Sequence, residues 1–232
     1  MEKHGLSQEG LKLFACVVML IDHVGAVLFP QHFWMREVGR LAFPIFCFLL
    51  AEGVHYTRSP GRYVLRLTIG AAISELPFDY GLFGRMTLGY QNVMLTMLLG
   101  FLALLALKKL NNPVLKVLAA AVCCGLAKLL KTDYAWGGVL LILLFGVTRE
   151  LPRRLLWQTI GMGILCGWVM PGAMIQVWGI RFGVELLAVF ALIPIALYSG
   201  KKLGHGKAAQ WGFYLFYPVH LSILWILRGM PV

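Results

Sequence analysis

The sequence predicts an all-α protein, a polytopic membrane bundle of about nine transmembrane helices, with its N-terminus in the cytoplasm and its C-terminus outside. The composition is the first indication: 59% of the 232 residues are hydrophobic, only 13% are charged, and the mean hydropathy is +0.78. Soluble domains are closer to half apolar and a quarter charged. The other two indications are the spacing of the apolar runs and the distribution of the basic residues between them.

The apolar runs are near the length of about 20 residues that a helix needs to cross the hydrocarbon core. Short connections rich in proline, glycine and asparagine, such as "TRSPGR" and "KKLNNP", separate them. No stretch is left for a soluble domain, so residues 1–232 are expected to form one transmembrane domain. The predicted spans are 10–29, 35–56, 61–80, 90–109, 113–130, 134–148, 154–171, 182–199 and 209–228.

The basic residues alternate between a crowded and a sparse set of connections. The crowded set is Lys3, Lys12, Arg58, Arg62, Arg66, Lys108, Lys109, Lys116, Arg149, Arg153, Arg154, Lys201, Lys202 and Lys207. The sparse set is Arg36, Arg40, Arg85, Lys128, Lys131, Arg181 and Arg228. Because cytoplasmic loops carry the excess of Lys and Arg, the crowded set is expected in the cytoplasm. Topology therefore explains the net charge of +11, and no nucleic-acid partner is expected.

The first apolar run is expected to stay in the mature chain, because it contains Asp22 and His23 and lacks a small-residue cleavage site. The cysteines all lie inside apolar runs without paired spacing, which predicts buried thiols rather than disulfides or metal ligands. We therefore expect no metal site. The cysteines are Cys16, Cys47, Cys123, Cys124 and Cys166.

Several ionisable or amide side chains lie inside the predicted spans, at or above the bilayer centre. An isolated charge at that depth costs about 2.5–3.5 kcal/mol even on the mildest scale, so we expect them to cluster and to form a polar cavity. They come from five spans and are Asp22, His23, Arg40, Glu75, Asn92 and His220. Two prolines add kinks nearby, because Pro44 frees the carbonyl of Arg40 and Pro218 frees that of Tyr214.

A second set of polar residues is predicted near the cytoplasmic side. Lys12, Cys16, Met19 and His23 have the spacing of one helical face, which connects the cytoplasmic end to the polar layer. Basic and aromatic residues at the start of the third span are suited to grip a phosphorylated cytoplasmic ligand. This inner set also includes Glu52, Arg58, Arg62, Tyr63 and Arg66.

The sequence resembles the TraX family. The specific segments are "LKLFACVVMLIDHVGAVLF", "GRLAFPIFCFLLAEGVHYTRSPGRYVLRL", "SELPFD" and "QNVMLTMLLG", within residues 10–105; "DYAWGGVLL" and "FYPVHLSIL" match more loosely. The resemblance implies a multi-pass acetyltransferase of a bacterial-type cytoplasmic membrane, which uses acetyl-CoA to acetylate the N-terminal amine of pilin. The family is also similar to transmembrane acyltransferases that modify sugars outside the cell. Those carry a basic residue, ten intervening residues and a histidine on the first helix; Lys12 and His23 have that spacing, with Lys in place of the usual Arg.

The resemblance and the predicted depths suggest roles for these residues. Lys12, Arg58, Arg62 and Arg66 would hold cytoplasmic acetyl-CoA, with Glu52 and Tyr63 beside them. His23 would accept a proton from the acceptor amine or hydroxyl, or would itself be acylated, and His220 is the rival base.

The remaining polar residues have structural alternatives. Asp22 is expected to pair with Arg40 or to orient a neighbouring helix. Arg40, Asn92 or Tyr217 would stabilise the developing oxyanion. Glu75, which precedes Pro77, either takes part in the reaction or caps a break in its helix, and Glu52 either faces the donor or pairs with Arg58 or Lys12.

Two other functions fit the same observations. Buried charges on several helices also form ion or proton pathways, so an ion- or proton-coupled transporter is one alternative. A non-catalytic membrane assembly factor is the other, in which the polar layer only joins helices. The expected partners of the enzyme are membrane lipid, the acyl-CoA donor and an extracytoplasmic peptide or glycan acceptor.

Overall fold

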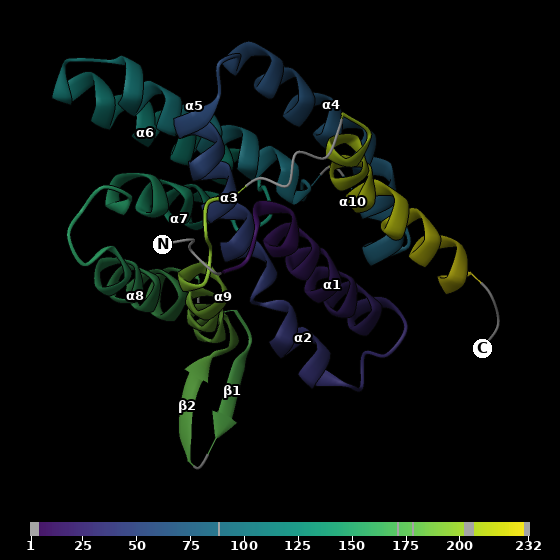
Figure 1. Ribbon diagram of the computed structural model, residues 1–232. Coiled ribbons are helices and arrows are strands. Elements are labelled where there is room, and N and C mark those ends of the chain that lie inside the picture. Colours follow the sequence, from purple (N-terminus) through teal and green to yellow (C-terminus); the bar gives the residue numbers. More distant parts are fainter. Residues whose placement is uncertain (1–4, 88, 171, 178, 202–206, 230–232) are drawn as a thin grey trace.

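The computed structural model describes residues 5–87, 89–170, 172–177, 179–201 and 207–229 of the chain, which are mostly helical (Figure 1). The helices of the first half are α1 (Gln8–Val27), α2 (Phe33–Gly39), α3 (Ala42–Tyr56), α4 (Pro60–Phe78) with a π-helical turn η1 (Asp79–Phe83), and α5 (Val93–Lys109). Those of the second half are α6 (Pro113–Leu129), α7 (Ala135–Thr148), α8 (Arg154–Ile164) with the π-helical turn η2 (Leu165–Val169), the 3₁₀ helix η3 (Val184–Ala191), α9 (Leu192–Ala196) and α10 (Lys207–Arg228).

Helix α3 lies at the centre of the bundle, where it packs against α1, α5, α7, η3 and α9 (Figure 1). Most of its residues are buried, among them Phe43, Ile45, Cys47 and Phe48. A helix that is apolar all round suits such a central position. The chain therefore surrounds this largely hydrophobic helix with other helices of the bundle.

Apolar side chains also cover the outside of the bundle. On α6 only Ala127 is buried, whereas Val117 is 69% and Leu129 76% exposed, and Trp168 is 87% exposed. Soluble proteins rarely expose contiguous apolar surface of this kind, so the exposed faces and the apolar helices indicate a membrane protein. Among the described residues, two helical segments are long and apolar enough to cross a bilayer, Gln8–Val27 and Phe33–Tyr56. The predicted nine crossings and the orientation stay predictions.

Local chemistry explains where several helices begin. The Ser7 hydroxyl accepts a hydrogen bond from the Gly10 amide at 3.0 Å and caps α1, and the side chain of Asn92 caps α5 by accepting from Met94. Asn112 caps α6 in the same way, with Pro113 in the first turn. These caps place the starts of α5 and α6 within a few residues of the predicted ones.

The predicted span 35–56 is broken in the structure. Helix α2 ends at Gly39 and α3 begins at Ala42, so Arg40 and Leu41 form a turn between them. Pro44 lacks an amide hydrogen and its ring clashes with the carbonyl of Arg40, which explains a break at this point. In contrast, α10 continues through Pro218.

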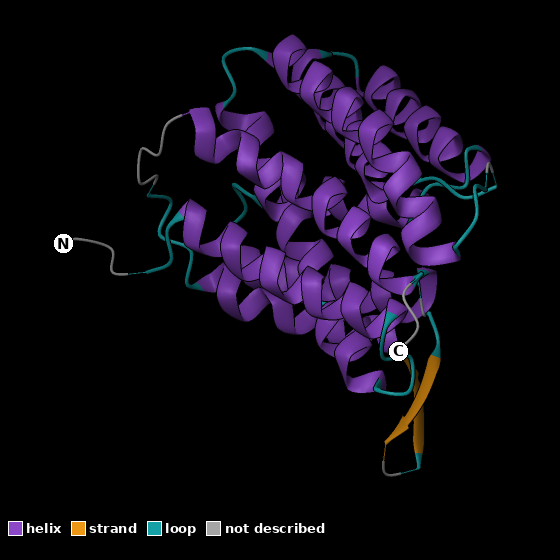
Figure 2. Cartoon of the chain, turned by 90° about the vertical axis from the view of Figure 1, so that its right-hand side faces the viewer, coloured by secondary structure: helices purple, strands orange, loops and turns teal. Residues whose placement is uncertain are grey.

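A short β-hairpin was not predicted, and it is an addition to a chain that is otherwise mostly helical as expected. Strands β1 (Met174–Val177) and β2 (Ile180–Gly183) pair in an antiparallel register with Ile175 opposite Phe182. The hairpin stands clear of the helices (Figure 2). The predicted helix 182–199 is therefore wrong at its start, since Phe182 and Gly183 belong to β2, and the helical part runs only from Val184 to Ala196.

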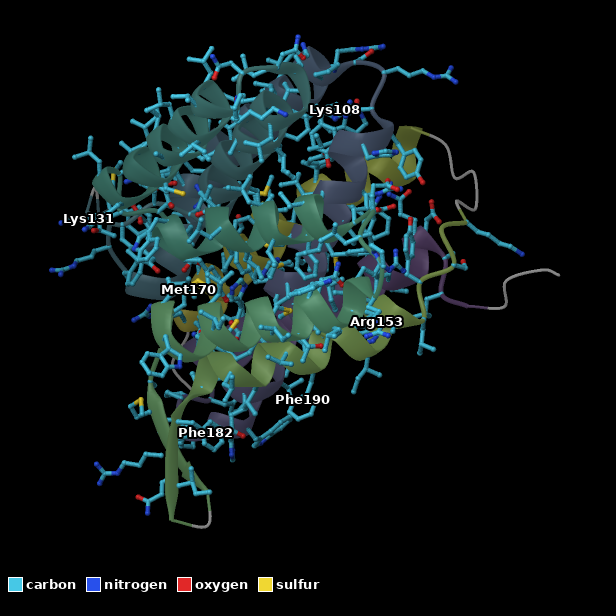
Figure 3. The ribbon with its side chains drawn as sticks, turned by 90° about the vertical axis from the view of Figure 1, so that its left-hand side faces the viewer. Lys108, Lys131, Arg153, Met170, Phe182 and Phe190 are labelled. Atoms are coloured by element: carbon cyan, nitrogen blue, oxygen red, sulfur yellow. The ribbon has the colours of Figure 1, made fainter. Side chains whose placement is uncertain are left out.

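Segments that the charge pattern assigns to one side of the membrane contact one another at one end of the bundle. Lys108 donates to the carbonyls of Val54 and His55, and the chain at Leu6 pairs with Tyr198. At the other end, Arg228 donates to the carbonyls of Gly81 and Leu82. Figure 3 shows Arg153 and Lys131, one from each set of basic residues, on opposite sides of the bundle. We call these ends inner and outer.

Candidate functional site

Two histidines from opposite ends of the sequence meet inside the bundle. His23 lies near the end of α1 and His220 in the middle of α10, and these two helices pack against each other. Nδ1 of His23 is 2.6 Å from Nε2 of His220, and the two rings are nearly parallel, with an interplanar angle of 9°. Nδ1 of His220 lies 2.6 Å from the carbonyl oxygen of Phe216, one turn earlier in α10. Both imidazoles are therefore fixed by hydrogen bonds.

The residue beside His23 anchors a buried ion-pair network. Asp22 Oδ1 accepts from Arg40 at 2.8 Å, and Oδ2 accepts from Arg36 at 2.6 Å. Arg40 also donates to Glu185 at 2.5 Å and, through Nε, to the carbonyl of Arg36 at 3.0 Å. Asp22, Arg40 and Glu185 are each 8% exposed, so every charge has a partner at short range, as burial requires. The network joins α1, the α2–α3 turn and η3.

Gly39 makes the close approach of this network possible. A Cβ atom at residue 39 would lie 2.0 Å from Oδ1 of Asp22, which is far below any van der Waals separation. Because Gly39, at the end of α2, has no side chain, the backbone at this residue can pass directly over the carboxylate of Asp22. The break between α2 and α3 then lets Arg40 reach Asp22 and Glu185 together.

A cavity of about 560 Å³ opens beside His23 toward the outer end. Charged groups at its wall are Asp22, Arg36, Arg40, Arg85 and Asp133, and aromatic rings complete much of the lining. The Tyr134 ring stacks on Phe43 with centroids 3.8 Å apart, and the Tyr90 hydroxyl donates to Asp133 at 2.7 Å. Burial raises the pKa of the Asp133 carboxyl, and the hydrogen bond from Tyr90 opposes that shift.

A second cavity, of about 570 Å³, opens toward the inner end. Lys12, Glu52, Tyr63 and Arg66 line it. The guanidinium carbon of Arg66 lies 5.2 Å from the ring centroid of Tyr63 and 5.7 Å from that of Tyr214, distances at which a cation and an aromatic face attract. Its Nε is buried and has no hydrogen-bond partner. This site therefore holds a cationic group with unused donor capacity.

The two cavities share part of their walls. Both are lined by Met19, Phe46, Val93, Met97 and Tyr217. We call these five residues the junction. Its side chains are apolar apart from the Tyr217 hydroxyl, and the Tyr217 ring centroid lies 6.1 Å from that of His23 and 5.8 Å from that of His220. The histidine pair thus stands where the inner and outer cavities approach each other.

The structure brings together four of the six residues predicted for the catalytic layer, namely Asp22, His23, Arg40 and His220. The expected ion pair between Asp22 and Arg40 is present. The other two lie apart: Asn92 donates to the carboxylate of Glu75 and, at 2.9 Å, to the carbonyl of Ala71. Asn92 is fully buried, caps α5 and does not line the outer cavity, nor does Glu75.

Of the six residues predicted for the inner site, four line the inner cavity, as above. Arg58 and Arg62 are not among its lining residues, and Arg62 donates instead to the Ser59 hydroxyl at 2.6 Å. Glu52 pairs with Arg149 at 2.6 Å, and not with Arg58 as one alternative had it. Arg149 also donates to the Tyr56 hydroxyl at 2.8 Å.

Sequence reasoning missed Arg36, which lines the outer cavity, and Glu185, which belongs to the adjoining ion-pair network. Arg36 had been counted only for topology, and Glu185 had no assigned role. A lone carboxylate inside the apolar run 182–199 is the signal that could have identified Glu185. Asp133 lies just before Tyr134, the residue that precedes α7, and its carboxylate accepts a hydrogen bond from the Tyr134 amide at 3.1 Å.

Comparison with known proteins shows the family to which the sequence of this chain belongs. The family model described as "TraX protein" matches residues 7–228. The chain belongs to the TraX family. This match confirms the resemblance, and it includes α10 with His220, which had matched more loosely. A relative, the "Probable fimbrial assembly protein FimC, serogroup H1" of Dichelobacter nodosus, is 29% identical over 92% of both chains.

A second relative of this TraX-family chain is an uncharacterized protein of Rickettsia prowazekii (strain Madrid E). It is 49% identical over 41 residues, which is 18% of this chain and 16% of the relative. No solved structure matches the chain. The family is therefore established through sequence, and the geometry of its site comes from the present structure.

Proposed function

We propose that this TraX-family protein is a membrane acetyltransferase. It takes acetyl from cytoplasmic acetyl-CoA and transfers it to an amine or hydroxyl group of a peptide or surface glycan at the outer side. The observation that carries this proposal is the pair of cavities from opposite ends that share a junction beside His23 and His220. Such a layout lets a donor and an acceptor approach one reacting centre from two sides of a membrane.

The inner cavity is the proposed donor site. The crowded set of basic residues supports a cytoplasmic position for this end under the positive-inside rule. Acetyl-CoA carries phosphates, and Arg66, with a buried Nε that lacks a partner, fits an anionic group. Lys12 lines the same cavity. The inner cavity also contains the carboxylate of Glu52, which forms an ion pair with Arg149. Because of this pair, Glu52 opposes phosphate binding less than an unpaired carboxylate would.

The junction is the proposed path of the thioester arm. Its methionines, Met19 and Met97, are flexible and adapt to irregular shapes. Phe46 and Val93 add apolar surface, so a slim, uncharged arm suits the junction better than a phosphate does. Met19 precedes His23 by one helical turn, so an arm in the junction ends beside the imidazole.

One histidine of the pair would act as general base and take the proton of the acceptor group. Arg40 is occupied by Asp22 and Glu185, and Asn92 by Glu75 and Ala71. Of the three groups considered for the oxyanion, Tyr217 therefore has the best position, since it lines both cavities. Its hydroxyl is a donor of the kind that stabilises developing negative charge.

The relative from Dichelobacter nodosus supports a pilus-related acceptor, because its name describes fimbrial assembly. The same name favours a second candidate, a non-catalytic assembly factor. The two differ in their need for acetyl-CoA. Purified full-length protein in nanodiscs should bind radiolabelled acetyl-CoA and release labelled acetate slowly, and His23→Ala should bind the label without turnover.

The control for this test is His32→Ala, which changes a histidine outside both cavities. It should match the unmodified protein. Absence of acetyl-CoA binding would contradict the acetyltransferase proposal and would favour the non-catalytic assembly factor. Proton-coupled flux in liposomes without any acetyl-CoA would favour the transporter instead.

A further inference from the structure

We infer that His220 is a positioning residue and that Nε2 of His23 is the basic atom. His220 holds His23 in one tautomer, with its proton on Nδ1 and its lone pair on Nε2. The role in transfer rests on the proposed function, but the tautomer itself can be measured without any reaction. His23 and His220 therefore have different roles, although the sequence could not distinguish the two histidines.

The carbonyl group of Phe216 fixes where the protons of both rings lie. The oxygen of Phe216 can only accept a hydrogen bond, so Nδ1 of His220, at 2.6 Å, must carry the hydrogen. A neutral imidazole has one donor and one acceptor nitrogen, which makes Nε2 of His220 the acceptor. Nδ1 of His23 lies 2.6 Å from that atom and therefore donates to it. The remaining nitrogen of His23, Nε2, is left with its lone pair.

The surroundings of His220 keep this arrangement in place. The residue is 5% exposed, and its ring stacks against Phe216 with centroids 4.9 Å apart. Both of its nitrogens are engaged, and it is not among the residues that line either cavity. His23, in contrast, lines the outer cavity. An acceptor group in that cavity meets the lone pair of His23 and no free nitrogen of His220.

The step balances with these two residues. Nε2 of His23 takes the proton of the acceptor N–H or O–H as the lone pair of the acceptor atom forms a bond to the thioester carbonyl carbon. The carbon–sulfur bond then breaks, and the thiolate leaves with that electron pair and takes the proton back from Nε2. Oδ2 of Asp22 lies 4.0 Å from Nε2, so a carboxylate oxygen is near the imidazolium that exists between these events. His23 and His220 end in their starting tautomers.

The tautomer is tested by nitrogen NMR on full-length protein in nanodiscs, with ¹⁵N-labelled histidine. The signal of His23 is assigned from its loss in His23→Gln. In the unmodified protein, Nδ1 of His23 should be protonated and Nε2 should not. His220→Leu removes the acceptor and should shift His23 toward the Nε2-protonated form. His220→Gln should restore the original form, because its amide nitrogen donates to Phe216 and its amide oxygen accepts from His23.

Transfer of acetyl to a synthetic peptide with a free N-terminal amine is measured on the same samples. His220→Leu should lose about 100-fold or more, His220→Gln should stay within about tenfold of the unmodified protein, and the matched control His32→Leu should be unchanged. A protonated Nε2 of His23 in the unmodified protein would overturn the inference, as would full activity in His220→Leu. If transfer is absent throughout while the tautomers follow the prediction, the proposed function fails and the positioning role stands.

Discussion

Gly39 and Asp22 are in direct contact, because the backbone of the glycine passes over the carboxylate where a Cβ atom would lie 2.0 Å from Oδ1. The contact lets Asp22 bind Arg36 and Arg40 while its neighbour His23 faces the outer cavity. Backbone approach, ion pairing and placement of the imidazole thus depend on one another.

Gly39→Ala should therefore displace Asp22 and lower both the stability and the activity of the protein. The added methyl group cannot be accommodated without moving the carboxylate away from its arginines. Thermal unfolding in detergent should show a lower midpoint than in the unmodified protein. Gly61→Ala is the matched control: a Cβ at that helical position has no atom within 4 Å, and alanine favours a helix by about 0.5–1 kcal/mol over glycine. Equal midpoints for the two variants would contradict the packing argument.

Arg40→Leu should cost about 3–5 kcal/mol of stability, because it leaves the buried carboxylates of Asp22 and Glu185 with fewer partners. Denaturant unfolding, monitored by tryptophan fluorescence, gives this free energy. Arg181→Leu changes an exposed arginine on the hairpin and should leave the free energy of unfolding within about 0.5 kcal/mol of the original value. A loss of similar free energy of unfolding in both variants would mean that the buried ion-pair network contributes no more to stability than an exposed arginine does.

Arg66→Leu should weaken acetyl-CoA binding about tenfold or more, since a hydrogen bond to a charged group contributes about 1.5–3 kcal/mol. The change removes the guanidinium from its place between Tyr63 and Tyr214. Equilibrium binding of labelled acetyl-CoA provides the measurement. The control is Arg62→Leu, one turn earlier on α4, which does not line the inner cavity. Equal losses in both variants would point to general attraction by the basic surface.

Met97→Trp should fill the junction and stop transfer while acetyl-CoA still binds at the inner cavity. The larger ring would occupy the path between the cavities that Met97 shares with Tyr217. Binding and peptide acetylation are measured in parallel, and Met86→Trp, at an exposed position, is the control. Transfer at the original rate in Met97→Trp would show that the acetyl group does not pass this point.

Much of this organisation could be predicted from the sequence. Apolar runs, prolines and capping residues located most helices, and the spacing of Lys12, Met19 and His23 predicted the face that connects the two cavities. The β-hairpin was missed because its strands are only four residues each, too short to distinguish from the ends of the neighbouring apolar runs.

The partners of individual charges could not be predicted in the same way. Depth in the membrane put Asn92 and Glu75 in one layer with His23, yet depth does not say on which side of a helix a residue lies. In the structure, the Asn92 side chain faces α4, where it donates to Oε2 of Glu75 and to the carbonyl of Ala71. Glu185 meets Arg40 although 145 residues separate them, a pairing that only the packing of η3 against α2 and α3 creates.

The central claim is transfer across the membrane through the junction beside His23. Its most direct measurement uses proteoliposomes of known orientation, with labelled acetyl-CoA at the inner face of the protein and, at the outer face, a peptide with a free N-terminal amine. Mass spectrometry should find the acetylated peptide with the unmodified protein, but not with His23→Ala, and not when both reactants are at the outer face. Acetylation that requires both reactants on one side, or that persists in His23→Ala, would contradict the account.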